Sequence, residues 1–520
     1  MPISSLLKIL QQQSNGSTDG SAALPNILII ITDQERALQH WPLDFSEKHL
    51  PSMERLKKHG IDFQQHYTNT CCCSPSRSTL LTSLFPVQTG VTRTGSPGPP
   101  IDLPTDIPNI ATVMKQAGYK HVHWYGKWHL GKTPASYGFE GWVPPDAGNY
   151  LSLNDTLGGG DPNNDGRFLD EVTKFLKTTA RRQSTPRNNG NSDESAREPF
   201  CVVASFVNPH DVYVAQHQPA LGYTPKDFQR IQAPLPSNYK EDPDENNKPR
   251  AQGQMSIRYV PFENDPQDYV NFYAYLHTVV DAQIGSLLDV LDDLDLTDST
   301  LILRTADHGE QALSHSLVEK FYNCYQESIH IPFVVSNPIA FPKAESTTAL
   351  TSHLDILPTL FNLGTIGASE KTARHEKWKG KDLTPILEDP QTRTKVPTGE
   401  HVQSQQEEIV GVQPHIHFTY DDISCPGAPS VIRCIRTLRY KYAVYFTPDG
   451  LDADWELYNL ISDPLEDKNH AGDPNYTTIQ ERLEKELQLV MDESGTLPTD
   501  FQWPPSSSPH SRGIAHTAAG

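Results

Sequence analysis

The sequence Asn26-Ile27-Leu28-Ile29-Ile30-Ile31-Thr32-Asp33-Gln34 places five aliphatic residues directly before a group of polar side chains. Such an unbroken apolar run is typical of a parallel strand that is buried on both faces of a sheet. In open α/β sheets, ligand sites lie at the carboxyl ends of the strands. The segment therefore predicts an α/β fold in which Asp33 and Gln34 reach a functional site.

Two later segments repeat this pattern. Residues 200–207 are apolar apart from one serine and precede Asn208-Pro209-His210-Asp211, and residues 300–304 precede Thr305-Ala306-Asp307-His308-Gly309. Between these runs, apolar spacing predicts amphipathic helices at 107–117 and 269–294. We therefore expect a large mixed, mostly parallel central sheet that is flanked by helices.

The pattern of the sequence changes near residue 380. Residues 25–380 carry the alternating strands and helices and are expected to form the main domain. Residues 381–500 are expected to form a smaller C-terminal α+β domain, with an antiparallel unit at 430–446 and 455–460 and a helix at 478–491.

Four polar segments fall outside this framework. Residues 1–24 are expected to be a disordered leader and residues 501–520 a disordered tail, because both are rich in polar and small residues. Residues 181–199 and 234–254 contain few apolar anchors and are expected to be surface loops.

Composition limits the classes of partner. The chain has 520 residues, a formal charge of −21 and an isoelectric point near 5.4, so its long-range field disfavours nucleic acid and anionic membranes. No apolar stretch approaches the roughly 20 residues that span a bilayer. The N-terminus lacks the pattern of a secretory signal, and seven cysteines, three of them consecutive, do not form a spaced disulfide framework. A cytoplasmic location is expected.

One segment indicates a chemical activity. Cys73-Ser74-Pro75-Ser76-Arg77, followed by Leu80-Leu81-Thr82, resembles the signature of the sulfatase family. Gly126-Lys127-Trp128-His129-Leu130-Gly131 resembles the family's second signature. Further similar segments follow in family order: Asn208-Pro209-His210, Asp307-His308-Gly309, His330-Ile331-Pro332, His353-Leu354-Asp355 and Trp455-Glu456-Leu457-Tyr458. Two departures are Ser83, where a glycine is usual, and a slightly longer interval between Gly118 and Gly126.

This resemblance implies an alkaline-phosphatase-like fold and a sulfuric ester hydrolase, with residues 25–380 as the catalytic domain. It also implies that a separate maturation enzyme oxidises Cys73 to formylglycine. A hydrated aldehyde offers one oxygen to attack a sulfate ester and a second hydroxyl whose deprotonation expels sulfate. A thiolate would instead leave a stable adduct. The implied substrate is a small-molecule sulfate ester.

The resemblance also implies a metal site and an anion clamp. One divalent metal would be held by Asp33, Gln34, Asp307 and His308 together with the derivative of Cys73. Ca²⁺ is favoured, with Mn²⁺ or Mg²⁺ as alternatives for this mixed donor set. The implied catalytic residues are Cys73, Arg77, Lys127, His129, His210 and Lys320, with Lys320 as an acid for the leaving group. Lys127 and His129 alternate, so an extended segment would face both toward one cavity.

Two alternatives to sulfate hydrolysis remain open. Asp33-Gln34 with Asp307-His308 also resembles the phosphonate monoester hydrolase branch and the choline-sulfatase-like branch, so a phosphonate or phosphate ester could use the same site. The chain could instead be an unmatured, non-catalytic relative that binds sulfate. A zinc cluster at the three cysteines is disfavoured, because adjacent residues do not place three sulfurs tetrahedrally.

No segment of the sequence identifies the leaving group. The sequence predicts that it contacts loops around Trp41, 137–142, Tyr213 and His401. No segment specifies an oligomeric state.

Overall fold

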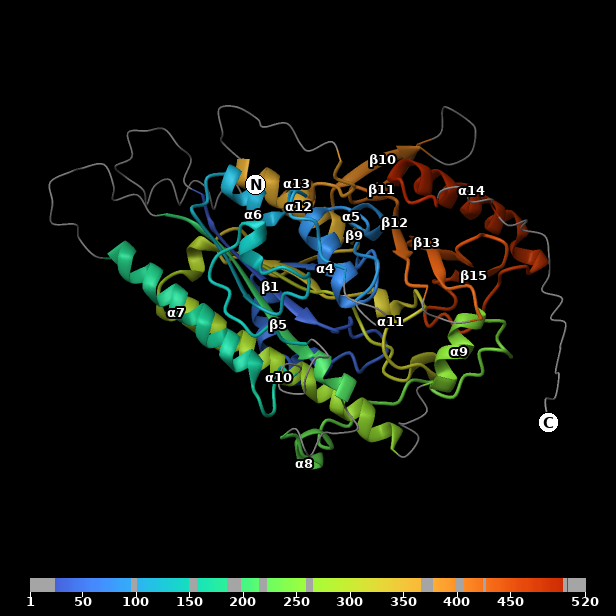
Figure 1. Ribbon diagram of the computed structural model, residues 1–520, viewed down its shortest axis with the longest axis horizontal. Helices are drawn as coiled ribbons and strands as arrows, with labels where there is room; N and C mark the ends of the chain where they lie inside the picture. Colours follow the sequence, from blue (N-terminus) through green and yellow to red (C-terminus); the bar gives the residue numbers. More distant parts are fainter. Residues whose placement is uncertain are drawn as a thin grey trace.

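The structure, a computed structural model, describes residues 24–94, 101–148, 157–184, 198–214, 222–258, 265–365, 377–397, 406–423, 427–498 and 503. A seven-stranded sheet lies at its centre (Figure 1). Its strand order is β4 (His121–Gly126), β5 (Phe200–Pro209), β1 (Asn26–Asp33), β6 (Thr300–Ala306), β7 (Phe333–Ser336), β2 (Gly60–Phe63) and β8 (Glu345–Thr347).

Strands β4, β5, β1 and β6 pair in parallel, whereas β7 pairs antiparallel with both β6 and β2. The predicted mixed, mostly parallel sheet is therefore confirmed. Because the three parallel strands β5, β1 and β6 are neighbours, their carboxyl ends meet at one edge. The polar segments that follow the three apolar runs are thereby brought together.

Alternate residues of β1 explain why its apolar run is unbroken. Ile27, Ile29 and Ile31 pack into a core on one face of the sheet, whereas Leu28 and Ile30 pack into a second core on the other face. All five side chains are buried. A strand with helices on both faces has no solvent side, so it carries no polar alternation.

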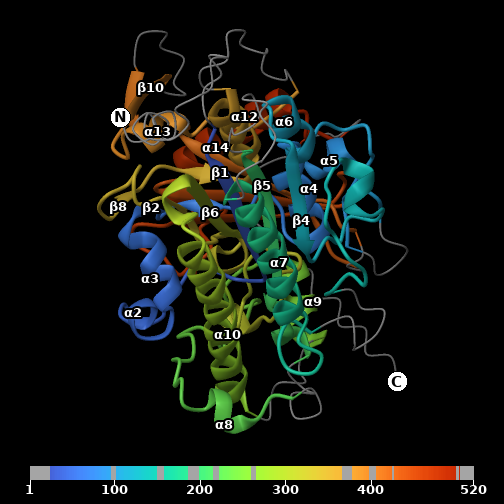
Figure 2. The same cartoon turned by 90° about the vertical axis from the view of Figure 1, so that its left-hand side faces the viewer.

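The first core lies under α4 (Cys73–Thr82), α6 (Ile110–Gln116) and α12 (Ile356–Thr365). The second lies under α3 (Pro51–Lys58), α7 (Asn164–Ser184) and α10 (Pro266–Asp293), of which α7 and α10 run side by side in Figure 2. The remaining short helices are α2 (Phe45–His49), α5 (Pro86–Thr89), α8 (Pro225–Phe228), α9 (Arg250–Arg258), α11 (Gln326–Ile329) and α13 (Thr384–Glu388).

The C-terminal part forms an antiparallel sheet of β12 (His415–Tyr420), β13 (Val431–Thr437), β14 (Tyr440–Phe446) and β15 (Ala453–Asn459). One face of this sheet packs under α14 (Thr477–Ser494), and the other packs against Cys71 and Cys72. The predicted hairpin and helix are confirmed, and the C-terminal sheet supports the segment that carries Cys73. Two two-stranded sheets complete the fold: β3 (His66–Tyr67) with β9 (Thr351–Ser352), and β10 (Arg393–Pro397) with β11 (Gln406–Val410).

The segment 234–254, which was expected to be a surface loop, is a loop with many exposed residues up to residue 249, and its last residues belong to α9. The side chain of Lys248 is buried and donates to the Tyr458 hydroxyl at 3.1 Å, and Arg250 pairs with Asp454 at 3.1 Å. These polar contacts anchor the segment to the C-terminal sheet, and they replace the apolar anchors whose absence the sequence indicated.

Further expectations concern the polar segments, a membrane span and the cysteines. The leader except Leu24, the tail except Trp503, and most of 181–199 lie outside the described residues. Among the described residues no helix combines the length and apolar character needed to cross a membrane. The six described cysteines are free thiols.

We expect Ile30→Ala to lower the free energy of unfolding by about 2–5 kcal/mol, because it leaves a cavity in a strand that is buried on both faces. Chemical denaturation followed by circular dichroism measures the change. The control is Leu451→Ala, whose side chain is 88% exposed and should change stability by less than about 0.5 kcal/mol. Equal losses in the two variants would contradict the two-core arrangement.

Candidate active site

Helix α4 begins at Cys73, directly after Cys72 in a left-handed conformation with φ 72°. The reversal of the backbone at Cys72 turns the three neighbouring sulfurs in different directions. The Sγ atom of Cys71 lies 3.6 Å from the carbonyl oxygen of Ser328, that of Cys72 lies 3.9 Å from the Tyr420 hydroxyl, and that of Cys73 lies 3.2 Å from Nε2 of His308. This divergence counts against a metal cluster on the three cysteines.

Helix α4 ends at Thr82, and the following Ser83 has φ 56°. A glycine would adopt this left-handed conformation at lower cost. The Ser83 hydroxyl group offsets part of that cost by donating to the carbonyl oxygen of Leu354 at 2.7 Å. Ser83, which stands where a glycine is usual, therefore still allows α4 to end after Thr82.

Four side chains at the strand ends and the helix start form a compact cluster. The ligand atoms of Asp33, Cys73, Asp307 and His308 all lie within 4.8 Å of one another, and all four residues are buried. Burial would lower the pKa of His308, but the neighbouring Asp307 and Cys73 raise it to about 9. Two carboxylates, an imidazole and the side chain at position 73 fit a divalent cation.

Arg77 lies one turn along α4 from Cys73 and joins the two carboxylates. Its Nε atom donates to Asp307 at 2.9 Å and its Nη2 atom donates to Asp33 at 3.0 Å. Its Nη1 atom donates to the carbonyl oxygen of Lys127 and to the Ser205 hydroxyl, each at 2.9 Å. All of its contacts come from different segments, so Arg77 fixes the strand ends relative to α4.

Lys127 follows β4 and lies 2.6 Å from the same oxygen of Asp33 that Arg77 contacts. Burial alone would raise the pKa of Asp33, but the charges of Lys127 and Arg77 hold it well below its usual range. Asp33 is therefore a carboxylate shared by two cations.

His129 does not continue an extended strand, so that expectation was wrong. Its φ is 60°, and its backbone N–H donates to Asp146 at 2.9 Å, as does that of Trp128 at 2.8 Å. Burial, with the charges of Lys127 and Arg77, lowers the pKa of His129 well below its usual range. The turn nevertheless leaves both Lys127 and His129 at the site.

His210 follows β5 and its ring lies against Tyr213, with 5.9 Å between the ring centroids. Burial and the charge of Lys127 lower the pKa of His210 well below its usual range. His210 therefore enters the site as a neutral imidazole.

Two buried carboxylates hold the end of β5 in place. Asp165 accepts from the backbone N–H groups of Val207 at 2.6 Å and Asn208 at 3.0 Å. Asp211 accepts from the Tyr223 hydroxyl and from the backbone of 158–159. Burial raises the pKa of Asp165 to about 7 and that of Asp211 to about 6.

The side chains of Gln34 and Lys320 contact each other, and the backbone N–H of Gln34 donates to Asp307 Oδ1 at 3.1 Å. The register of β1 against β5 shifts between Ile31 and Asp33, and Gln34 has φ 65°. The Oε1 atom of the Gln34 side chain accepts from Lys320 Nζ at 2.8 Å. Its Nε2 atom donates to Glu310 at 2.6 Å and to Glu319 at 3.1 Å.

The structure thus brings together Asp33, Cys73, Arg77, Lys127, His129, His210, Asp307 and His308, with Gln34 and Lys320 beside them. Sequence reasoning missed Asp146, Glu310 and Glu319. Glu310 follows Asp307-His308-Gly309 directly, which is the one signal that could have indicated it.

The residues that were predicted to lie near the leaving group have different surroundings. Trp41 is buried against Phe45 and Tyr273, and Tyr137 is buried with its hydroxyl bound to Leu103, so both belong to the core. Tyr213 lies beside His210, and His401 lies outside the described residues.

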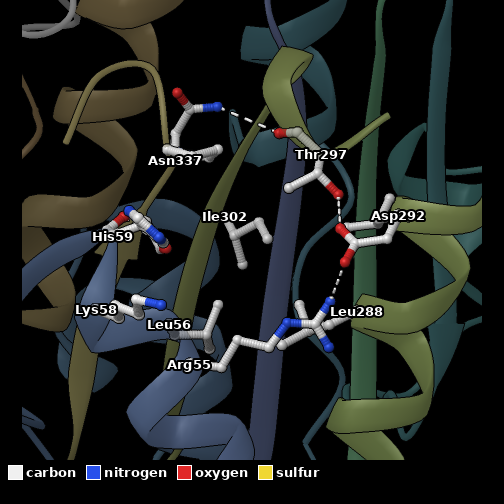
Figure 3. Close-up of a pocket in the computed structure, with 12 residues that line it drawn as sticks. Arg55, Leu56, Lys58, His59, Leu288, Asp292, Thr297, Ile302 and Asn337 are labelled. Carbon is white, nitrogen blue, oxygen red and sulfur yellow. Dashed lines mark hydrogen bonds and ion pairs between the residues drawn. The ribbon is translucent and has the colours of Figure 1, made fainter. Parts of the chain in front are cut away.

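A cavity of about 320 Å³ lies near the start of β6, away from the cluster (Figure 3). Its floor includes Leu56, Leu288 and Ile302, and its polar rim is paired internally, because Arg55 contacts Asp292 at 2.6 Å. It contains none of the predicted site residues.

The chain matches known protein families over most of its length. Residues 25–366 match the family described as Sulfatase, and residues 314–493 match the family described as N-sulphoglucosamine sulphohydrolase, C-terminal. The chain is 26% identical over 436 residues to the Delta 4,5-hexuronate-2-O-sulfatase of Bacteroides thetaiotaomicron, which covers 82% of this chain and 80% of the relative. It is 28% identical over 500 residues to the choline-sulfatase of Rhizobium meliloti, covering 88% and 85%.

Solved structures share the fold. The phosphonate monoester hydrolase from Silicibacter pomeroyi superposes with a TM-score of 0.67 at 20% identity, covering 91% of this chain and 96% of the other. The match to the Sulfatase family spans more than half of the chain, and the motifs that carried the resemblance meet in one buried cluster. The chain therefore belongs to the sulfatase family.

Proposed function

We propose that the chain hydrolyses the sulfate monoester of a small molecule to an alcohol or phenol and inorganic sulfate at Cys73. The observation that carries this proposal is the contact of Cys73 Sγ with Asp33 at 3.7 Å and His308 at 3.2 Å. Cys73 lies one helical turn before Arg77 in α4. A nucleophile in this position meets a metal-binding cluster on one side and fixed cations on the other.

Conversion of Cys73 to formylglycine by a maturation enzyme would supply a hydrated aldehyde as the nucleophile. The start of α4 favours this position for an anion, because the helix dipole is positive there. Arg77 would hold the nucleophile and its sulfated form, and His129 would bind or deprotonate the diol. Lys127 would bind a sulfate oxygen. Donors that are fixed before the reaction stabilise developing charge most effectively.

A divalent metal fits the donor set of Asp33, Asp307, His308 and the Cys73 derivative. When bound, it would act as a Lewis acid toward the sulfate oxygens. Ca²⁺ is our first choice, with Mn²⁺ or Mg²⁺ as alternatives, because the imidazole departs from an all-oxygen set. Gln34 would join this set only through an oxygen that already accepts from Lys320.

His210 and Lys320 would act at the leaving group. Neutral His210 can donate a hydrogen bond to the bridging oxygen, and the Lys320 ammonium group can transfer a proton to it as the bond to sulfur breaks. Tyr213 lies near both, 6.0 Å from Lys320 Nζ by its ring centroid. The leaving group would therefore depart past Tyr213.

A phosphonate or phosphate ester is the second candidate. Gln34 and His308 match the phosphonate monoester hydrolase pattern, and the fold of such an enzyme superposes on this chain. A phosphate monoester carries nearly two negative charges, whereas a sulfate monoester or a phosphonate monoester carries one. Charge alone therefore disfavours the phosphate monoester more than the phosphonate.

Coexpression with a formylglycine-generating enzyme should lower the mass of the peptide containing Cys73 by about 18 Da, because the thiol is oxidised to an aldehyde. Intact-peptide mass spectrometry measures the shift. It should be absent in Cys73→Ala, which should also lose activity on 4-nitrophenyl sulfate. Cys71→Ala is the matched control and should keep the shift. A wild-type peptide without the shift would favour the unmatured, non-catalytic alternative.

Removal of one cluster carboxylate should remove the metal. We expect Asp307→Asn to retain little divalent metal after dialysis, as measured by elemental analysis. The wild type should gain about 2.7 kcal/mol of stability at 100 times the dissociation constant, and the variant should gain almost none. Asp281→Asn is the control, since Asp281 is also buried but binds the backbone of Ser52 and Met53. Metal retained equally in both variants would reject the site.

Sulfate should be preferred to phosphonate. We expect a larger kcat/KM for 4-nitrophenyl sulfate than for 4-nitrophenyl phenylphosphonate when the same matured preparation is measured. Sulfated phenols, sulfated sugars and choline sulfate would then identify the leaving group. A much larger kcat/KM for the phosphonate would overturn the preference for sulfate.

A further inference from the structure

Lys320 is held in a closed ring of hydrogen bonds. Its ammonium group donates to Gln34 Oε1 and to Glu319 Oε2, each at 2.8 Å. The ring closes because Gln34 Nε2 donates to the same Glu319 oxygen at 3.1 Å. All three side chains are buried, so water competes little for these bonds. The ring also fixes the orientation of the Gln34 amide.

Glu310 holds this ring of hydrogen bonds in place. Its Oε2 atom accepts from Gln34 at 2.6 Å, and its Oε1 atom accepts from the Tyr269 hydroxyl at 3.0 Å. The same Oε1 atom accepts from the backbone N–H groups of Ala312 at 3.1 Å and Glu319 at 2.8 Å. Glu310 is thus tied to α10 and to the loop that carries Glu319, and it holds both partners of Lys320.

The backbone at Glu319 is constrained as well. Glu319 has φ 68°, and Ala312 and Leu313 in the same loop have φ 45° and 72°. Left-handed conformations at residues other than glycine persist only where the surroundings enforce them, and they cluster at functional sites. The contacts with Glu310 therefore keep the Glu319 carboxylate on the Lys320 side.

Two aromatic rings lie near the ammonium group. The ring centroids of Phe321 and Tyr213 lie 5.2 Å and 6.0 Å from Lys320 Nζ. Tyr213 also stacks beside His210, at the side assigned above to the leaving group. Lys320 therefore lies near both its hydrogen-bond partners, Gln34 and Glu319, and the side assigned to the leaving group.

We propose that Glu319 is a positioning residue, which holds the Lys320 ammonium group, together with Gln34, at the point where it meets the oxygen of the leaving group. This inference rests on the proposed function. A lysine side chain has many rotamers, and fixed acceptors offset the entropy lost when one of them is selected. A displacement of about 1 Å can lower a rate by about 10²-fold, so the loss of such a holder has a measurable effect.

The experiment is a double-mutant cycle of Glu319→Ala and Lys320→Ala with two leaving groups, 4-nitrophenyl sulfate and phenyl sulfate. Phenolate is the poorer leaving group and depends more on a proton donor. We expect Glu319→Ala to lower kcat for phenyl sulfate by about 10-fold or more and for 4-nitrophenyl sulfate by less than about 3-fold. In the Lys320→Ala background, Glu319→Ala should change either rate by less than about 2-fold, because both residues act through one group.

Two further variants separate this role from general damage to the fold. Glu319→Gln keeps the size of the side chain with a weaker acceptor, so the same selectivity with smaller amplitude is expected even where Glu319→Ala does not fold. Glu456→Gln removes a buried carboxylate that accepts from Gln252 at 2.6 Å and Tyr445 at 3.0 Å, outside the site, and should show no leaving-group selectivity.

Equal losses for the two sulfates, or additive losses in the cycle, would overturn the positioning role while leaving the proposed function intact. If the wild type hydrolyses phosphonates but no sulfates, the sulfate proposal fails. The same double-mutant cycle, measured with 4-nitrophenyl phenylphosphonate and phenyl phenylphosphonate, then decides the role of Glu319. A matured wild type that hydrolyses neither class overturns both.

Discussion

The buried carboxylate of Asp33 sets the arrangement of the site. An ionised carboxylate that is removed from water is strongly destabilising unless cations and donors surround it. Arg77 from α4 and Lys127 from the end of β4 both meet one oxygen of Asp33, and Arg77 also meets Asp307. These segments are distant in sequence, and they must converge for the charge to be compensated. Because Cys73 begins the same helix as Arg77, this convergence also places the nucleophile.

The convergence is supported from both sides of the sheet. The two apolar cores on β1 fix the strand whose end carries Asp33, and the C-terminal sheet packs against Cys71 and Cys72. The ends of the other strands are held by carboxylates that accept backbone N–H groups, as Asp165 does at β5 and Asp146 does after β4. A side chain displaced by a fraction of an ångström would lose these bonds, so precise packing far from Cys73 contributes to the geometry at Cys73.

The sequence was sufficient for the parts of the molecule that follow from periodicity and local motifs. The strands at Ile27, Val202 and Ile302 were predicted because strands that are buried on both faces carry continuous apolar runs. The cluster of Asp33, Asp307 and His308 was predicted because parallel strands end at one edge. The turn at His129 was not predicted, because its left-handed backbone depends on the Asp146 carboxylate 17 residues away.

The same reason explains the glutamates that were missed. Glu310 and Glu319 contact Gln34 because the loop between them adopts several left-handed conformations. The residues of this loop that adopt them are not glycines, so the sequence did not indicate these conformations. The burial of Trp41 and Tyr137 could not be predicted from the sequence either, because aromatic residues near motifs occur both at binding surfaces and in cores. Contacts made by side chains across loops therefore marked the limit of prediction from this sequence.

The balance of charge at the site bears on the choice of substrate. Each cation there has a carboxylate beside it: Arg77 with Asp307, Lys127 with Asp33, and Lys320 with Glu319. Glu310 adds a fourth buried carboxylate, and His308, with its pKa raised to about 9, adds a fourth cation, so the charges of these side chains nearly cancel. The protein side chains alone therefore offer little net attraction for an ester anion, and a divalent cation would supply most of it. With so small a surplus of positive charge, a singly charged ester is bound at less electrostatic cost than a doubly charged one. Charge therefore separates phosphate monoesters from sulfate and phosphonate monoesters, but it does not separate the latter two from each other.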